Sequence, residues 1–293
     1  MSLSTLKSVN HVAGLITSEQ VALDLFFAEG VIAPIRKCKK CGRDMVLRKR
    51  KETFEGKQIE GLLNGGIRKG SWLDKTRISL KDAILTIVLW INRYSSTMIR
   101  NETKLNPGTV VDFRNYLRNA CTEIRETYVK LGGPNSVIQI DEYAVHSRKY
   151  GRGEADRELT WILGAIETGS RKCFVQIVPN RSMSTMIPIL RRWISPDSTV
   201  WTDSHKSYSS LNKYFRHHET VNHSIEFTKV GPDGTIIHTN SIESLWKRLK
   251  TPLKEMNGTS EALLPSYLDE LVVREHEADG FAGAIWNYIK NFK

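Results

Sequence analysis

Two aspartates in the second half of the chain stand where a metal site could form. Asp141 directly follows the apolar run SVIQI (136–140), and Asp203 directly follows STVWT (198–202). Both carboxylates are therefore expected at the ends of strands, where side chains can converge on one site. If the two strands are parallel neighbours, the pair can hold one or two divalent cations, and oxygen ligands favour Mg²⁺ or Mn²⁺ over zinc. Taken singly, either aspartate could instead cap a turn or a helix.

The stretch HTNSIESLWKRLK (238–250) adds a third candidate ligand. If it is helical from Asn240, then Asn240 and Glu243 share one face, and Lys250 follows two turns after Glu243. We expect Glu243 to be the third metal ligand, because a carboxylate binds Mg²⁺ more strongly than the amide of Asn240, which is the alternative. Lys250 would contact a phosphate, so the site would suit in-line displacement at phosphorus. The competing interpretation is an amphipathic surface helix with an ordinary charge pair.

The sequence pattern of the second half of the chain predicts three strands, followed by alternating helices and strands. Its expected elements, in order, are strands at 136–140, 160–166 and 172–178, a helix at 183–194, a strand at 198–202, a β-rich run at 224–230 and helices from about 240. The spacing of the first three strands is typical of an antiparallel meander. The whole order predicts a mixed α/β sheet with helical flanks.

Helical patterns dominate the first half. They cover residues 18–31, residues 79–94, one short helix within 95–106, and residues 107–129. A helix-turn-helix arrangement of these helices would offer basic residues to a DNA backbone, namely Arg100, Lys104, Arg114 and Arg118. The alternative is a helical linker whose charges are simply solvated. The glycines and proline of LGGPN (131–135) should end this region.

Cys38 and Cys41 begin a zinc-ribbon pattern that the sequence does not complete. The basic, alternating stretch after them predicts a small hairpin module. A structural zinc needs four N or S ligands, but no second cysteine pair follows nearby, and His11 is the only histidine before His146. We expect a partial module, with zinc at Cys38 and Cys41 as the alternative. The four cysteines of the chain are too few for a disulfide framework, which predicts an intracellular, reducing compartment.

The charge of the chain indicates a polyanionic partner. The formal net charge is +11 and the sequence pI is about 9.5. Nucleic acid is the favoured partner, and an acidic membrane surface is the alternative. No apolar run approaches the length of about 18 residues that a membrane span needs, and the first residues lack the features of a secretory signal. We therefore expect no membrane-spanning segment.

Three motifs together resemble the Merlin transposases and their bacterial insertion-sequence relatives with an N-terminal zinc ribbon. The motifs are QIDEYAV (139–145), VWTDSHKSY (200–208) and HTNSIESLWKRLK, and the likeness extends to CKKCG and RKGSWLDKTRISL nearer the front of the chain. The resemblance implies an RNase H-like catalytic domain over residues 134–293. It would carry Asp141 on its first strand, Asp203 after its fourth strand and the last carboxylate on a helix.

By this resemblance the chain would be a DDE transposase. Using Mg²⁺, it would cleave double-stranded DNA at terminal inverted repeats and join the freed ends to target DNA, acting as a homodimer or higher oligomer. It would work in the nucleus of a eukaryote, or in the cytoplasm or nucleoid of a bacterium. An RNase H-like nuclease or resolvase and a non-catalytic DNA-binding derivative are the alternatives.

This interpretation predicts three domains. Residues 1–75 would hold the first helix and the partial zinc-ribbon-like module, residues 76–133 the helical DNA-binding region, and residues 134–293 the catalytic domain. The basic stretch 146–157 follows Asp141 closely, so it is either a DNA contact or a solvated hairpin tip.

Overall fold

The computed structural model consists of two compact units. It describes residues 3, 8–37, 40–45, 51–54, 57–60, 67–145, 159–221, 228–231 and 234–292. One unit comprises residues 1–124 and 279–293, and the other comprises residues 125–278. The three predicted domains, 1–75, 76–133 and 134–293, are functional regions and not these compact units, and that division stays a prediction.

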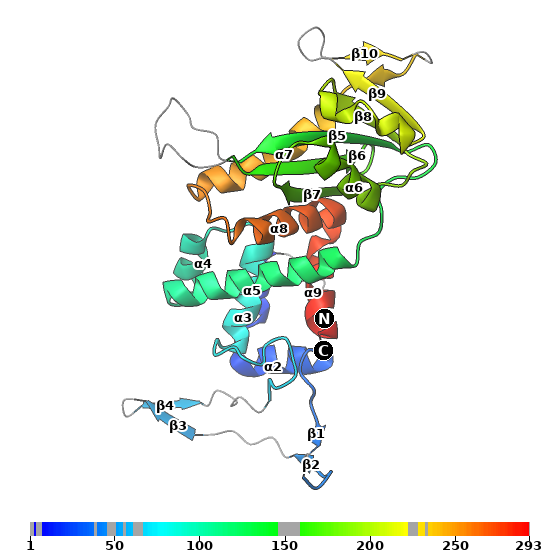
Figure 1. Cartoon of the computed structure of the whole chain (residues 1–293). Helices are drawn as coiled ribbons and strands as arrows, with labels where there is room; N and C mark the ends of the chain where they lie inside the picture. The colour runs from blue at the N-terminus through cyan, green and yellow to red at the C-terminus, as the bar shows by residue number, and fades with distance from the viewer. Residues whose placement is uncertain are drawn as a thin grey trace. The chain divides into compact units, whose positions relative to one another are not determined.

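The second unit is built on a five-stranded mixed sheet (Figure 1). In chain order its strands are β5 (Val137–Ala144), β6 (Trp161–Glu167), β7 (Cys173–Val178), β8 (Thr199–Asp203) and β9 (His217–Val221). The spatial order is β7-β6-β5-β8-β9. β6 pairs antiparallel with both β5 and β7, whereas β5, β8 and β9 run parallel. The predicted meander is confirmed, and β5 and β8 meet the condition for a shared metal site, because they are parallel neighbours.

Alternation along β5 sends its side chains to two different cores. Ile138 and Ile140 pack with α6 (Met183–Trp193) and with residues from the short 3₁₀ turns η2 (Lys206–Tyr208) and η3 (Leu211–Lys213). On the opposite face, residues of β6 and β7 pack with α7 (Asn240–Glu255) and α8 (Leu264–Glu277). Because side chains of a strand alternate between faces, neighbouring residues of β5 point toward different helices.

The fifth strand of the sheet, β9, was not predicted from the sequence. We expected a β-rich run at 224–230, and of its described residues Lys229 and Val230 form the strand β10, which pairs with β11 (Ile236–Ile237), whereas the strand beside β8 is β9. Residues 222–227 lie outside the described part of the chain. β9 has the sequence HHETV and lies at the edge of the five-stranded sheet, beside β8. An edge strand can be polar, whereas a central strand that is covered on both faces is apolar.

The first unit consists mainly of helices. Its helices are α1 (Val9–Leu15), α2 (Glu19–Ala28), α3 (Leu80–Ile91), α4 (Ser96–Thr103), α5 (Pro107–Glu126, which runs into the second unit) and α9 (Phe281–Asn291). Ser18, Ser79 and Ser95 cap α2, α3 and α4 by accepting a backbone N–H. The four predicted helices are confirmed, while α1, too short to show a clear apolar period, was not predicted.

Of the four basic residues expected to face DNA, Arg118 is buried and Arg114 is half-buried. Arg118 is only 2% exposed and donates to Asn115. Arg114 donates to the carbonyl of Tyr94. The expectation that all four are available was therefore wrong for Arg118, because it lies on the buried side of α5; Arg100 and Lys104 are exposed.

Two small hairpins precede α3. β1 (Arg36–Lys37) pairs with β2 (Asp44–Met45), and β3 (Lys51–Phe54) pairs with β4 (Lys57–Glu60), so the predicted hairpin module is confirmed. Cys41 is exposed, and Cys38 lies outside the described residues. Zinc binding by this pair stays a prediction.

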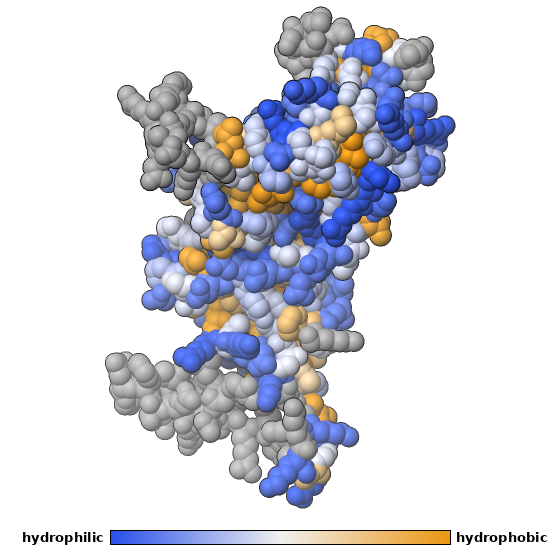
Figure 2. Space-filling model, viewed as in Figure 1, coloured by the Kyte–Doolittle hydropathy of each residue, from blue (hydrophilic) through white to orange (hydrophobic). Residues whose placement is uncertain are grey.

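Two observations concern the distribution of apolar residues. On the face seen in Figure 2, hydrophilic residues predominate over apolar ones. Among the helices that the structure describes, none has the length and apolar character needed to cross a membrane.

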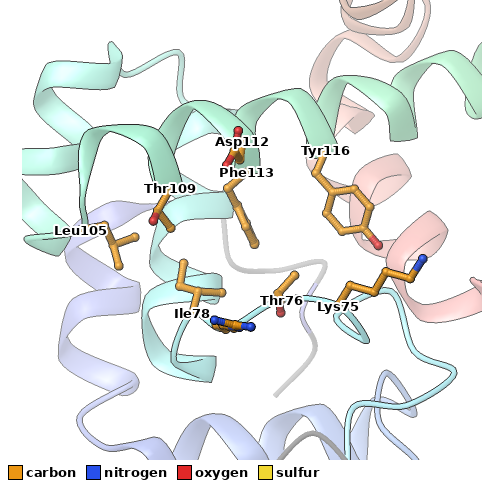
Figure 3. A pocket seen from close by; sticks show the side chains of 9 residues that line it. Lys75, Thr76, Ile78, Leu105, Thr109, Asp112, Phe113 and Tyr116 are labelled. Atoms are coloured by element: carbon orange, nitrogen blue, oxygen red, sulfur yellow. The ribbon is translucent and has the colours of Figure 1, made fainter.

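A pocket of about 580 Å³ lies within the first unit (Figure 3). The segment before α3 forms one wall with Lys75 and Ile78, and α5 forms the other with Asp112, Phe113 and Tyr116. None of the predicted catalytic residues lines it.

Candidate active site

Asp141 and Asp203, far apart in sequence, meet beyond the hydrogen-bonded part of β5 and β8. The two strands pair from Val137 to Gln139 on the β5 side. Past that point, Asp141, Glu142 and Asp203 each offer a ligand oxygen, and these oxygens lie within 4.8 Å of one another. The expected convergence of the two aspartates is therefore present, with a third carboxylate beside them.

Glu142 was not singled out from the sequence. It follows Asp141 on β5, so the two side chains leave the strand on opposite faces, Asp141 toward α7 and Glu142 on the α6 face with Ile140. Their carboxylates still approach each other at the end of the strand. The signal available in the sequence was a second acidic residue directly after Asp141. Side chains of consecutive strand residues point to opposite faces, so this position was not expected to share a site with Asp141.

Trp246 of α7 holds Asp141 by a direct hydrogen bond. Its indole Nε1–H donates to Asp141 Oδ2 at 2.8 Å. Gly164 stands opposite Asp141 in the β5–β6 pairing, and a Cβ there would lie 2.4 Å from the Trp246 ring. The indole can reach Asp141 because the position across the sheet has no side chain.

Gln139 fixes the start of α7 on β5. This fully buried side chain accepts the backbone N–H groups of Ser241 at 2.9 Å and Ile242 at 3.1 Å. Its amide nitrogen also lies 3.2 Å from His238 Nδ1. Two otherwise unbonded donors of the first helical turn are satisfied in this way. A residue two positions before Asp141 therefore sets where α7 begins.

The residues predicted on α7 lie at its exposed edge. α7 begins at Asn240, as expected, and Asn240 and Glu243 are both exposed. Thr239 donates its hydroxyl to Glu243 Oε1 at 3.0 Å. Glu243 is near enough for its charge to act on Asp141, although it is outside the group of three carboxylates found among the described residues. Lys250 places its ammonium 4.2 Å from the centre of the Tyr143 ring.

Asp203 is oriented by the turn that follows it. Its Oδ1 accepts the backbone N–H of His205 at 2.9 Å. The same turn leads into η2, whose last residue, Tyr208, is buried beneath the carboxylates. Lys206 on this turn is exposed.

Comparison with known proteins connects this geometry to a family. Residues 121–276 of the 293 match the ISXO2-like transposase domain, which is more than half of the chain and includes the three clustered carboxylates. The chain belongs to the ISXO2-like transposase family. It is also similar to an uncharacterized transposase-like protein of Haemophilus influenzae, with 32% identity over 99 residues that make up 34% of this chain and 76% of that protein.

In this ISXO2-like transposase domain, burial raises the pKa of two of the three clustered carboxyls. The pKa of Asp141 rises to about 6, mainly through burial and further through the charges of Asp203 and Glu243, while the Trp246 N–H partly opposes the rise. The pKa of Glu142 rises to about 7, again mainly through burial, with the Tyr208 hydroxyl opposing. Carboxylates this close repel one another, so a bound cation would favour the charged form of all three.

The transposase match also locates the other predicted residues. Asn240, Glu243 and Lys250 lie inside the matched region, whereas Cys38 and Cys41 precede it. The basic stretch 146–157 is inside it too, but it lies outside the described residues.

Proposed function

We propose that this chain is a transposase that cleaves DNA at transposon ends and joins the freed ends to target DNA by metal-dependent, in-line phosphoryl transfer. The observation that carries the proposal is the convergence of Asp141 and Asp203, whose ligand oxygens lie within 4.8 Å of each other inside a transposase domain. Two carboxylates this close repel each other, and a bound cation would offset that repulsion. A role in a turn or a helix cap would not bring them together.

The second unit has an RNase H-like fold in this proposal. Its support is the sheet order β7-β6-β5-β8-β9, in which β6 alone runs opposite to the other strands. Asp141 then stands on the first strand of the sheet and Asp203 ends the fourth, as the family resemblance implies.

The donor atoms fit Mg²⁺ or Mn²⁺. All the clustered ligands are carboxylate oxygens, which hard divalent cations prefer. Asp141 and Asp203 would hold the cation, and Glu243 would complete the set, with Asn240 one turn earlier as the alternative. When bound, the metal would stabilise charge on the oxygens of the phosphate under attack. Lys250 would hold a DNA phosphate at the same face of α7.

The DNA partners would be the terminal inverted repeats and the target. The first unit would recognise the ends through a helix-turn-helix arrangement of α3 to α5, and its exposed Arg100 and Lys104 would contact phosphates. The net charge of +11 supports a polyanionic partner. Joining two ends in one event requires at least a dimer on DNA.

Other parts of the expected picture stay predictions. They are the Merlin subtype, zinc at Cys38 and Cys41, and the compartment, whether nucleus, cytoplasm or nucleoid. Membership of a transposase family is the part that the comparisons support.

The test of the proposal is a cleavage and strand-transfer assay. The purified full chain is incubated with DNA carrying the candidate element's terminal repeats, with Mg²⁺, with Mn²⁺ or with chelator. The proposal predicts nicks at the ends and joined products with either metal and none with chelator. Specific binding without products, by folded and metal-loaded protein, would instead favour the non-catalytic DNA-binding derivative, and cleavage of branched DNA alone would favour a resolvase.

A further inference from the structure

The half-buried Glu142 and the buried Tyr208 belong to the acidic cluster but are left out of the set Asp141, Asp203 and Glu243. Glu142 offers an oxygen within 4.8 Å of those of Asp141 and Asp203. It reaches the cluster from the α6 face of the sheet, whereas Asp141 approaches from the α7 face. Asp203 ends the neighbouring strand, so the three carboxylates come to one place from two strands and from both faces of the sheet.

A second observation at the same place points to a ligand. Glu142 Oε1 is buried and has no hydrogen-bond partner among the described residues. Buried polar atoms are rarely left unsatisfied, since their desolvation is then uncompensated. A cation bound at the cluster would give this oxygen a partner. The Tyr208 side chain is only 1% exposed, and its hydroxyl makes no hydrogen bond of normal geometry among the described residues but lies close enough to Glu142 for each group to shift the pKa of the other.

Arg181 does not supply that partner. Arg181 is close enough for its charge to act on Glu142. Its guanidinium lies over the Trp161 ring, 3.9 Å from the ring centre, and the described residues show no ion pair between Arg181 and Glu142. Glu142 is therefore not explained as half of a structural salt bridge.

We propose, on the basis of the proposed metal-dependent transposase function, that Glu142 is a further ligand of the divalent cation held by Asp141 and Asp203, and that Tyr208 positions it. One carboxylate oxygen of Glu142 binds the cation, and the other accepts the Tyr208 hydroxyl. Hydrogen bonds of this kind orient a metal-bound carboxylate and hold it in place. The site thus takes a ligand from each face of the sheet.

Mn²⁺ affinity, measured by electron paramagnetic resonance on the full chain at pH 8, tests this assignment. Glu142→Gln should weaken Mn²⁺ binding by at least about 10-fold, and Tyr208→Phe, which changes no charge, should weaken it by about 10-fold. Glu167→Gln is the matched control, because Glu167 lies on the neighbouring strand β6 and bonds to Ser136 and Ser170 outside the cluster. It should bind Mn²⁺ like the wild type. Circular dichroism establishes that each variant is folded.

A further variant separates ligation from charge. Glu142→Asp keeps the negative charge but withdraws the carboxylate by one methylene group, so a ligand role predicts weaker Mn²⁺ binding. Wild-type affinity in Glu142→Asp or Glu142→Gln would overturn the ligand assignment, while loss of binding in Asp141→Asn would show that the cation is still held at the site that the proposed function requires. A wild-type chain that binds no Mn²⁺ would overturn both.

Discussion

At the end of β5, the neighbouring residues Asp141 and Glu142 have different contacts, because side chains of a strand alternate between the two faces of the sheet. Asp141 accepts a hydrogen bond from Trp246 on α7, and Glu142 lies near Tyr208 on the opposite face. Both carboxyls are largely withdrawn from water, and that burial is the main reason why each has a raised pKa. The cluster is thus costly to ionise without a cation.

This cost should appear in the pH dependence of stability when metal is chelated. The pKa of Glu142 rises from 4.5 to about 7 on folding, so the native state keeps a proton that the unfolded state releases. The stability contributed by that proton is complete below pH 4.5 and is lost as the pH rises through about 7, by roughly 3 kcal/mol. Glu142→Gln removes this loss, so relative to the wild type it should gain stability between pH 5 and pH 8. Urea unfolding in chelator at both pH values measures the gain, and an equal difference at the two pH values would contradict it.

The third ligand of the proposed site can be decided by separate alanine substitutions. Glu243→Ala should lower metal-dependent cleavage by about 100-fold or more, which corresponds to about 3 kcal/mol of lost transition-state stabilisation. Asn240→Ala should change it little, because the amide is the weaker ligand for Mg²⁺. Single-turnover cleavage rates at saturating metal provide the comparison. Equal, small losses from both variants would show that neither residue is the third ligand.

At the scale of elements, the position of α7 depends on one glycine of the neighbouring strand. A Cβ at Gly164 would lie 2.4 Å from the Trp246 ring, so Gly164→Ala must displace the indole that bonds to Asp141. We expect a loss of about 1–3 kcal/mol in unfolding free energy from overpacking and a loss of about 10–100-fold in cleavage from the disturbed support of the ligand.

Gly283→Ala is the control for that substitution. Gly283 lies in α9, and an added Cβ there meets no atom within 4 Å. Alanine is the better helix former, so this variant should be unchanged in cleavage and as stable as the wild type or up to about 1 kcal/mol more stable. Urea titrations and end-cleavage rates of both variants test the pair. Normal cleavage by Gly164→Ala would show that the Trp246–Asp141 contact is dispensable.

The elements with a strong local signal were predictable from the sequence. An apolar face located α2 and α3, the length of the segment between α3 and α5 left room for α4, and apolar runs located β5 and β8, which place Asp141 and Asp203. The strand β9 was missed because it pairs with one neighbour only and has a polar sequence. Its place is decided by the hydrogen bonds of β8, a contact between segments that no local pattern records.

The contacts that complete the candidate site were less predictable for the same reason. Gln139 and Tyr208 are ordinary polar residues in sequence, and their importance comes from burial against α7 and against the carboxylates. Arg118 carries a charge that suggested DNA contact, yet the packing of α5 buries it. Residue type indicated which side chains could bind a metal or DNA, and tertiary packing determined which of them lie together or at the surface.

At the scale of the whole molecule, DNA binding and DNA cleavage should be separable. In the proposed function, DNA binding by a chain of net charge +11 would rest largely on counterion release from the phosphates, which does not require the carboxylate cluster. Cleavage would depend on that cluster. A substitution that removes one metal-binding carboxylate should therefore stop cleavage and leave DNA affinity almost unchanged.

The most direct measurement compares end cleavage by the wild type with cleavage by Asp141→Asn and Asp203→Asn at protein concentrations that give equal occupancy of end DNA. Both variants keep the size of the side chain and lose its charge. Our account predicts wild-type affinity for DNA, at one fixed salt concentration, and no metal-dependent nicks or joined products from either variant. Cleavage by either variant at a rate near that of the wild type would contradict the assignment of the active site.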